Sequence, residues 1–224
     1  IIVGARLGHC LFYEPAYYLS HPLEMILPIS FTPAGGIKIV GYQGLASHGG
    51  ILGLLIALYI YSRKTNHSMI DAVDLITVVA GLSFAFIRLG NFMNSEIIGM
   101  PTTKPWAVIF TRVDELPRHP AQLYEAISYF IIFAVLMFLY KKRRSRLKNG
   151  FFFGLGSALF FTARFLIEFI KEDQVGFEQE MIFNMGQLLS IPFILAGIGF
   201  MIYSLRTTKN IAHNKTSNPK ESSI

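Results

Sequence analysis

The chain has 224 residues, of which 52% are hydrophobic and only 15% are charged, and its formal net charge is +6. A soluble domain usually carries about a quarter charged residues, so the composition excludes an ordinary soluble domain and favours a helical membrane domain. Nucleic-acid binding is not favoured, because six basic side chains are gathered in KKRRSRLK at 141–148, between apolar stretches, as in a cytoplasmic loop.

The chain opens with about a dozen apolar residues before Tyr13. A membrane span needs about 20 residues, so we interpret this start as the end of a helix and the sequence as N-terminally truncated. Prolines between 14 and 44 exclude long helices there. Cys10 is the single cysteine, which excludes an internal disulfide and gives no zinc-site pattern.

Apolar stretches of membrane length follow. They lie at 45–61, 69–90, 121–140, 150–171 and 181–205. The loops between them alternate between basic and neutral or acidic, so the positive-inside rule places the C-terminus in the cytoplasm and the loops 14–44 and 91–120 outside. We expect an all-α integral membrane protein, a polytopic helical bundle, with one transmembrane domain over 1–206 and a disordered cytoplasmic tail over 207–224.

Polar side chains lie inside or beside these stretches, where an ionisable group is energetically unfavourable by about a few kcal/mol or more. They are His48, Arg88, Asn91, Glu96, His119, Gln122, Glu125, Arg164 and Glu168. Such residues usually face a protein interior and mark a functional path. Basic and amide groups suit an anion such as a lipid phosphate, so the set indicates a membrane enzyme or transporter that handles phospholipid.

The run RLGNFMNSEIIG at 88–99 is the densest of these sites. Arg88 and Asn91 are three residues apart and share one face of a helix. A guanidinium forks onto two phosphate oxygens, and the amides of Asn91 and Asn94 are suited to donate to ester or phosphate oxygens. Glu96 is placed to hold an arginine. The alternative is a polar helix end that meets water.

Two histidines are candidate bases. His48 lies in the SHGG motif at 47–50, and an imidazole accepts a proton at physiological pH. His119 precedes Pro120, which suits the first turn of a helix, where the positive helix end favours anions. For His48, the alternative is a histidine that is only hydrogen-bonded inside the bundle. For His119, the alternative is an interfacial segment.

Arg164 and Glu168 are four residues apart in the stretch at 150–171. We expect an ion pair in which Glu168 orients Arg164 onto a phosphate. A purely structural ion pair is the alternative. Asp71 and Asp74 lie at the start of their helix, where stabilisation of the helix N-terminus explains both.

Together these runs resemble the bacterial prolipoprotein diacylglyceryl transferases. The matching pieces are GARLGHCLFY at 4–13, SHGG at 47–50, RLGNFMNSEIIG at 88–99, RHPAQLYE at 118–125, ARFLIEFIK at 163–171 and MGQLLSIP at 185–192. The resemblance covers the chain up to about Leu205.

The resemblance implies a seven-helix enzyme of the bacterial cytoplasmic (inner) membrane, of which about five and a half helices are present here, with an active site towards the periplasmic face. It implies transfer of the sn-1,2-diacylglyceryl group from phosphatidylglycerol to the lipobox cysteine thiol of a preprolipoprotein. A thioether forms and glycerol phosphate leaves, as the first step of lipoprotein maturation. The implied partners are phosphatidylglycerol, the preprolipoprotein signal peptide and membrane lipids, with no nucleic acid, metal or organic cofactor.

The resemblance also assigns residues to roles. The implied catalytic residues are His48, Arg88 and Arg164. The implied substrate-binding residues are Arg88, Asn91, Asn94, Glu96, Gly99, His119 and Glu168. The sequence departs from the family at Ser95, where the family has glycine, and at Phe160, where some members carry a tyrosine hydroxyl. The family's first helix, with its tyrosine-bearing motif, does not match any part of the sequence.

Two other functions compete with the transferase. A lipid or polar-solute transporter also carries intramembrane Arg and His, but it forms no covalent product; the lack of an internal repeat disfavours the inverted-repeat transporters. A non-catalytic assembly or lipid-binding protein would tolerate His48→Gln and Arg88→Ala.

Overall fold

The computed structural model describes residues 1–27, 29–31, 36–39, 41, 44–172 and 183–217. Its internal contacts group the chain into two compact units, Ile1–Met69 and Ile70–Ile224. The sequence predicted a single transmembrane domain over 1–206. Each unit has its own packing, which the sequence pattern of apolar stretches does not reveal.

The described residues of the first unit form four helices and a small antiparallel hairpin. In chain order these are α1 (Ile2–Phe12), α2 (Pro15–Ser20), α3 (Pro22–Ile26), β1 (Ile29–Phe31), β2 (Ile37–Ile39) and α4 (Ser47–Thr65). Both α2 and α3 are short and begin with proline at the first helical position, where the missing N–H is tolerated. The prediction that the proline-containing segments exclude long helices is confirmed for the described residues between 14 and 44.

Glycines bring α1 and α4 into backbone contact. Gly4 and Gly8 of α1 lie against Gly49 and Gly53 of α4, and a Cβ added at Gly49 would overlap the Gly4 carbonyl oxygen and the Gly8 Cα. Small residues at such spacing let two helices approach closely in a membrane. The first glycine of the SHGG motif therefore has a packing role.

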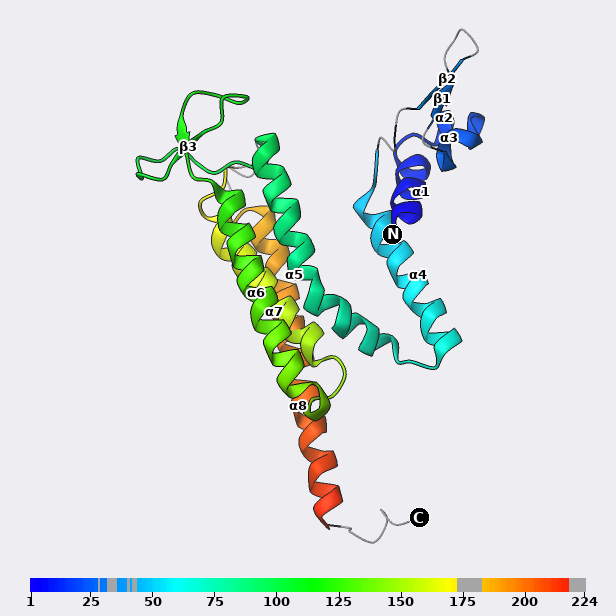
Figure 1. Ribbon diagram of the computed structural model, residues 1–224, viewed down its shortest axis with the longest axis vertical. Helices are drawn as coiled ribbons and strands as arrows, with labels where there is room; N and C mark the ends of the chain where they lie inside the picture. The colour runs from blue at the N-terminus through cyan, green and yellow to red at the C-terminus, as the bar shows by residue number, and fades with distance from the viewer. Residues whose placement is uncertain (28, 32–35, 40, 42–43, 173–182, 218–224) are drawn as a thin grey trace. The chain divides into compact units, whose positions relative to one another are not determined.

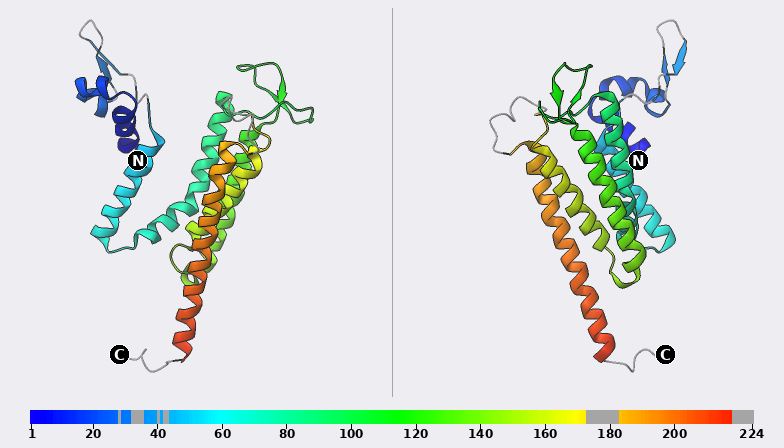
Figure 2. Two further views of the ribbon diagram at one scale, coloured as in Figure 1. Left: turned by 180° about the vertical axis from the view of Figure 1, so that it is seen from behind. Right: turned by 60° about the vertical axis from the view of Figure 1, so that its left-hand side comes forward.

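The second unit holds the long helices. They are α5 (Met69–Asn94), α6 (Ala121–Arg143), α7 (Phe151–Glu168) and α8 (Met185–Ser217), with a 3₁₀ turn at Arg144–Arg146. Between α5 and α6 the strands β3 (Val108–Ile109) and β4 (Pro117–Arg118) pair antiparallel. The figures show α6, α7 and α8 side by side, with β3 at one end of the bundle (Figures 1 and 2).

Four helices of the described part are long and apolar enough to cross a membrane: 69–94, 121–146, 151–168 and 185–207. The predicted class, a helical multi-pass membrane protein, is therefore confirmed. The stretch at 45–61 is helical within α4 but is not among these four. Its helix begins with the polar Ser47 and His48 and ends with Arg63 and Lys64, which shorten the apolar part.

The last helix is longer than the sequence predicted. α8 continues to Ser217, so 207–217 are helical where we expected a disordered tail. A helix can continue there because 207–217 contain neither glycine nor proline, and the first proline follows at Pro219. The remaining part of the predicted tail, 218–224, lies outside the described residues.

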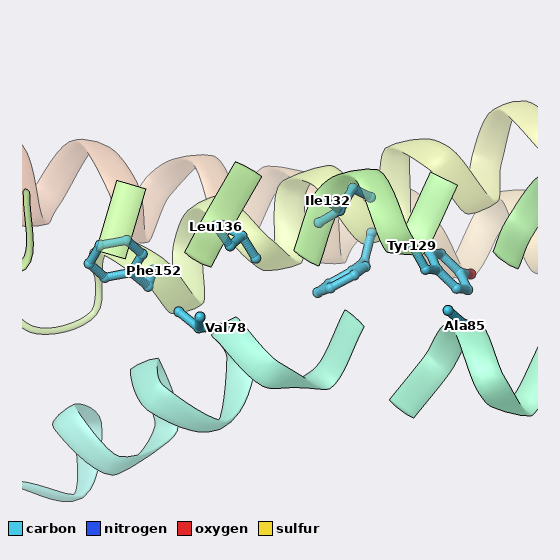
Figure 3. Close-up of a cluster of buried hydrophobic side chains, with 7 residues drawn as sticks. Val78, Ala85, Tyr129, Ile132, Leu136 and Phe152 are labelled. Carbon is cyan, nitrogen blue, oxygen red and sulfur yellow. The ribbon is translucent and has the colours of Figure 1, made fainter. Parts of the chain in front are cut away.

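An apolar cluster joins α5, α6 and α7 (Figure 3). Its buried members are Val78, Ala85, Tyr129, Ile132, Leu136, Phe152 and Phe160. Gly154 of α7 and Gly197 of α8 allow those two helices to touch backbone to backbone. By contrast, large apolar side chains such as Phe86, Ile131 and Phe138 are exposed on the outside of the spans, as expected for a surface that faces lipid.

Asp74 stabilises a different helix from the one that the sequence suggested. Its carboxylate is fully buried and accepts hydrogen bonds from the backbone N–H groups of Gly150 and Phe153, at 2.8 and 2.7 Å. These donors lie at the start of α7, where helix N–H groups have no partner within the helix. Asp71, in contrast, forms an ion pair with Arg144.

We expect Asp74→Ala to destabilise the protein by about 1–3 kcal/mol, because it removes a helix cap and leaves two N–H groups without an acceptor. Asp71→Ala on the same helix is the matched control, since a partly exposed ion pair contributes about 0–1 kcal/mol. Thermal unfolding of both variants in detergent measures the difference. Equal unfolding midpoints for the two variants would contradict the assignment of Asp74 as the cap of α7.

Candidate functional site

Charged residues gather where three helices meet near one end of the second unit. Arg88 lies near the end of α5, Glu125 in the first turns of α6, and Arg164 and Glu168 in the last turns of α7. Lys171 follows α7 directly. We call these five residues the charged cluster. The same end of the bundle carries the β3–β4 hairpin (Figure 1).

The prediction that Arg88 and Asn91 share one helix face is confirmed. The Arg88 Nη1 donates to the Asn91 side-chain oxygen at 3.3 Å. The Asn91 amide donates in turn to the Glu96 carboxylate at 2.7 Å. Glu96 thus acts on Arg88 through Asn91 and makes no direct contact with the guanidinium. This chain of contacts fixes Asn91 with its amide oxygen towards the arginine.

Glu125 joins two cations inside the bundle. It is fully buried; its Oε2 lies 2.8 Å from the Arg88 Nε, and its Oε1 lies 3.3 Å from the Lys171 Nζ. Lys171 is also buried and contacts the Glu168 carboxylate at 3.0 Å. A buried charge is tolerated only when it is paired. The pairs therefore form one continuous chain from Arg88 through Glu125 and Lys171 to Glu168.

The expected ion pair between Arg164 and Glu168 is not found. Glu168 pairs with Lys171, which lies three residues further along and reaches back to it. Within the described ranges, Arg164 makes no ion pair, and it lies in electrostatic range of the buried Tyr129. Arg88 and Glu125 are in range of the same Tyr129 side chain, and Arg88 hydrogen-bonds it. Among the described residues, Arg164 is thus the one member of the charged cluster without an ion pair.

His119 belongs to a separate set of contacts. Its Nδ1 lies 3.1 Å from the Tyr124 hydroxyl, which also accepts a hydrogen bond from the Trp106 indole N–H at 2.7 Å. The backbone carbonyl oxygen of His119 accepts a hydrogen bond from the backbone N–H of Gly99. A Cβ on Gly99 would overlap that carbonyl, so this position requires glycine for the close approach of two backbones.

The turn after α5 explains the departure at Ser95. Ser95 has a φ of +60° and Ile97 a φ of +55°, in the left-handed region that favours glycine. The family's glycine fits this conformation without strain, and serine adopts it here. The Gln122 amide of α6 donates to the Glu96 carbonyl at 2.6 Å and holds the turn against the next helix.

Two predicted site residues stand apart from these contacts. Asn94 is the last residue of α5 and is exposed. His48 is the second residue of α4, in the first unit, and is exposed there.

Lys171 and Tyr129 are members of this constellation that the sequence did not indicate. Lys171 lies at the end of an apolar stretch. A lysine there normally extends to the membrane surface, so its position did not suggest a functional role. Tyr129 resembles any aromatic core residue. Glu125 carried a signal, since it is a carboxylate within a predicted span, but its partners lie 37 and 46 residues away in the sequence.

The cluster is suited to bind an anion. It combines three cations with the two carboxylates Glu125 and Glu168, and Arg164 lacks a carboxylate partner among the described residues. A guanidinium has five N–H donors, and the contacts of Arg88 with Glu125, Asn91 and Tyr129 leave some of them for a ligand. In the part of the chain that the structure describes, no three His, Cys, Asp or Glu side chains lie together as a metal site requires.

Comparison with known proteins gives matches over almost the whole chain. Residues 1–203 match the family described as prolipoprotein diacylglyceryl transferase. A protein of Bacteroides fragilis, named phosphatidylglycerol–prolipoprotein diacylglyceryl transferase, is 60% identical over 203 residues, which cover 91% of this chain and 73% of that protein. Proteins with the same name from Chloroherpeton thalassium and Tolumonas auensis are 47% and 45% identical; each alignment covers 92% of this chain, and 72% and 75% of the relative.

Proposed function

The chain belongs to the prolipoprotein diacylglyceryl transferase family, and we propose that it performs the reaction of that family at the charged cluster. As the motifs predicted, it is a membrane-embedded phosphatidylglycerol–prolipoprotein diacylglyceryl transferase, and it acts at the first step of lipoprotein maturation. The proposal rests on one observation above all: Arg88 is paired with the buried Glu125, and Arg164, which has no ion pair among the described residues, lies in electrostatic range of the same Tyr129 side chain as Arg88.

The proposed reaction joins a lipid carbon to a protein sulfur. The thiolate of the lipobox cysteine attacks the carbon of the diacylglycerol part that carries the phosphate. The carbon–sulfur bond forms, and the bond from this carbon to the phosphate oxygen breaks. The electron pair of the broken bond stays on the departing glycerol phosphate. Arg88 and Arg164 bind that phosphate and stabilise the charge that grows on it, a contribution of about 3–4 kcal/mol for one well-placed donor.

The thiol must lose its proton before it attacks, since the thiolate is the nucleophile. We propose His48 as the proton acceptor on the basis of the family resemblance, with a contribution of about 10²–10⁴-fold. His119 is the second candidate, and its Nδ1 lies 3.1 Å from the Tyr124 hydroxyl. We assign His119, with Asn91, Asn94, Glu96 and Gly99, to the surroundings of the bound lipid.

The charge of the loops supports an orientation in the bacterial inner membrane. The basic run at 141–148 begins in the last turn of α6 and lies at the opposite end of that helix from Glu125. Under the positive-inside rule the basic end faces the cytoplasm. We therefore propose that the charged cluster lies towards the periplasmic side, where a translocated prolipoprotein presents its cysteine.

Mass spectrometry of a peptide substrate tests the function. The protein is incubated in detergent with phosphatidylglycerol and a peptide that contains a lipobox cysteine. We expect the peptide to gain the mass of one diacylglyceryl group, and a peptide with serine in place of cysteine to remain unmodified. Folded protein that binds phosphatidylglycerol without forming this adduct would overturn the proposal in favour of a transporter or lipid-binding protein.

A further inference from the structure

The segment between α5 and α6, residues 95–120, forms a fixed structure that we call the head loop. Arg118 is buried at its centre, donates to the Gly99 carbonyl at 3.1 Å and pairs with Asp114 and Glu172. The hydrogen bond from Arg118 holds the pKa of the Asp114 carboxyl below its usual value, so the pair is charged at neutral pH. Phe110 is buried and packs edge-on against Phe92 of α5.

One face of this rigid loop is apolar and exposed. In the β3–β4 pair, Val108 lies opposite the buried Arg118, whereas Ile109 lies opposite Pro117 and both of these are exposed. Paired residues of an antiparallel ladder share a face, so Ile109 and Pro117 point away from the protein. Val113 and Leu116 are exposed in the turn between the strands. Exposed large apolar groups of this kind mark contact with an apolar partner.

The position of Trp106 sets the depth of the loop. Its indole N–H donates to the hydroxyl of Tyr124 at 2.7 Å, and Tyr124 is the fourth residue of α6. The apolar part of α6 begins at Ala121, and about 20 residues cross the hydrocarbon core. Tyr124 therefore lies close to one boundary of that core, and the hydrogen bond keeps Trp106 at the same level.

Trp106 is 56% exposed as a residue although its polar N–H already has a partner. What it offers to its surroundings is thus apolar ring surface at the height of a membrane boundary. Tryptophan and tyrosine are enriched there, because an apolar ring and a polar group are both accommodated. The head loop leads directly into α6 (Figure 1), which carries exposed apolar side chains such as Ile127 and Ile131.

We propose that the head loop is a membrane-contact surface, with the Trp106 ring inserted between the lipid headgroups and the upper acyl chains. The occupant is the bilayer itself, recognised through apolar and aromatic contact. This surface does not depend on the transfer reaction, and it belongs to a loop that lies beside the charged cluster.

The fluorescence of Trp106 tests the proposal without any mutation, because it is the single tryptophan of the chain. The protein is reconstituted into phosphatidylcholine vesicles whose acyl chains carry bromine either near the headgroup or near the chain end. We expect blue-shifted emission, strong loss of intensity with bromine near the headgroup, smaller loss with bromine near the chain end, and little quenching by aqueous iodide.

A depth control uses Ile131→Trp in a Trp106→Phe background. Ile131 lies in the middle of α6 and is exposed to lipid, so its replacement should be quenched most by bromine near the chain end. Emission of Trp106 that iodide quenches and bromine does not would overturn the proposal in favour of a loop in water. Emission that neither agent quenches would overturn it in favour of a loop covered by protein.

Discussion

Replacing Arg164 by glutamine is expected to lower the rate of diacylglyceryl transfer by about 10²–10³-fold, the usual loss when one donor to a developing negative charge is removed. Stability should change little, by about 1 kcal/mol or less. The reason is that, among the described residues, Arg164 forms no ion pair, so its removal leaves no buried carboxylate uncompensated. The measurement compares initial rates of adduct formation with unfolding midpoints.

Arg112→Gln is the matched control for this prediction. Arg112 is an exposed arginine of the head loop, and the contact that its guanidinium makes among the described residues is a long one, 3.5 Å, with the Met93 carbonyl. The Arg112→Gln substitution removes one positive charge, as Arg164→Gln does, from the same end of the second unit but not from the charged cluster. If both variants lost activity equally, a general effect of surface charge on anionic lipid would explain the result, and the assignment of Arg164 to the phosphate would be wrong.

Local spacing in the sequence was sufficient to find part of the site. Arg88 and Asn91 lie one helical turn apart, and an i,i+3 relation on a helix survives whatever the tertiary structure is. The same reasoning failed for Arg164 and Glu168. Their i,i+4 spacing permits an ion pair, but Lys171 competes for the carboxylate, and Glu125 from another helix holds Lys171 in place.

The side-chain contacts between different helices could not be predicted from the sequence. Asp74 was expected to stabilise its own helix, yet it caps α7 through donors 76 and 79 residues away. The sequence does not distinguish a carboxylate that caps its own helix from one that caps another helix. Only the packing of α5 against α7 decides which N–H groups Asp74 contacts. The apolar pattern predicted the long helices for a simpler reason: the bilayer demands about 20 apolar residues wherever a helix crosses it.

Replacing Glu125 by glutamine should have the largest effect on stability. The carboxylate is fully buried between Arg88 and Lys171. Its removal leaves Arg88 without a carboxylate partner among the described residues and leaves Lys171 with Glu168 alone. Breaking a buried ion pair in this way is destabilising by about 3–5 kcal/mol. The free energy of unfolding in detergent measures the loss. Glu115→Gln, at an exposed glutamate of the head loop, is the control and should be nearly neutral.

A second substitution separates the charge effect from a simple loss of packing. The double variant adds Lys171→Gln to Glu125→Gln. Both single changes break the same contact between Glu125 and Lys171, so the double variant should be more stable than the sum of the single changes predicts, by about 1–3 kcal/mol. Strict additivity would show that Glu125 and Lys171 do not act as a pair. The transfer rate of folded double variant should still be low, because Glu125 is the carboxylate that fixes the Nε side of Arg88 and aims its remaining donors. Low transfer by the folded double variant, with the Lys171→Gln single variant still active, is therefore the outcome that identifies Glu125 as a positioning residue for Arg88.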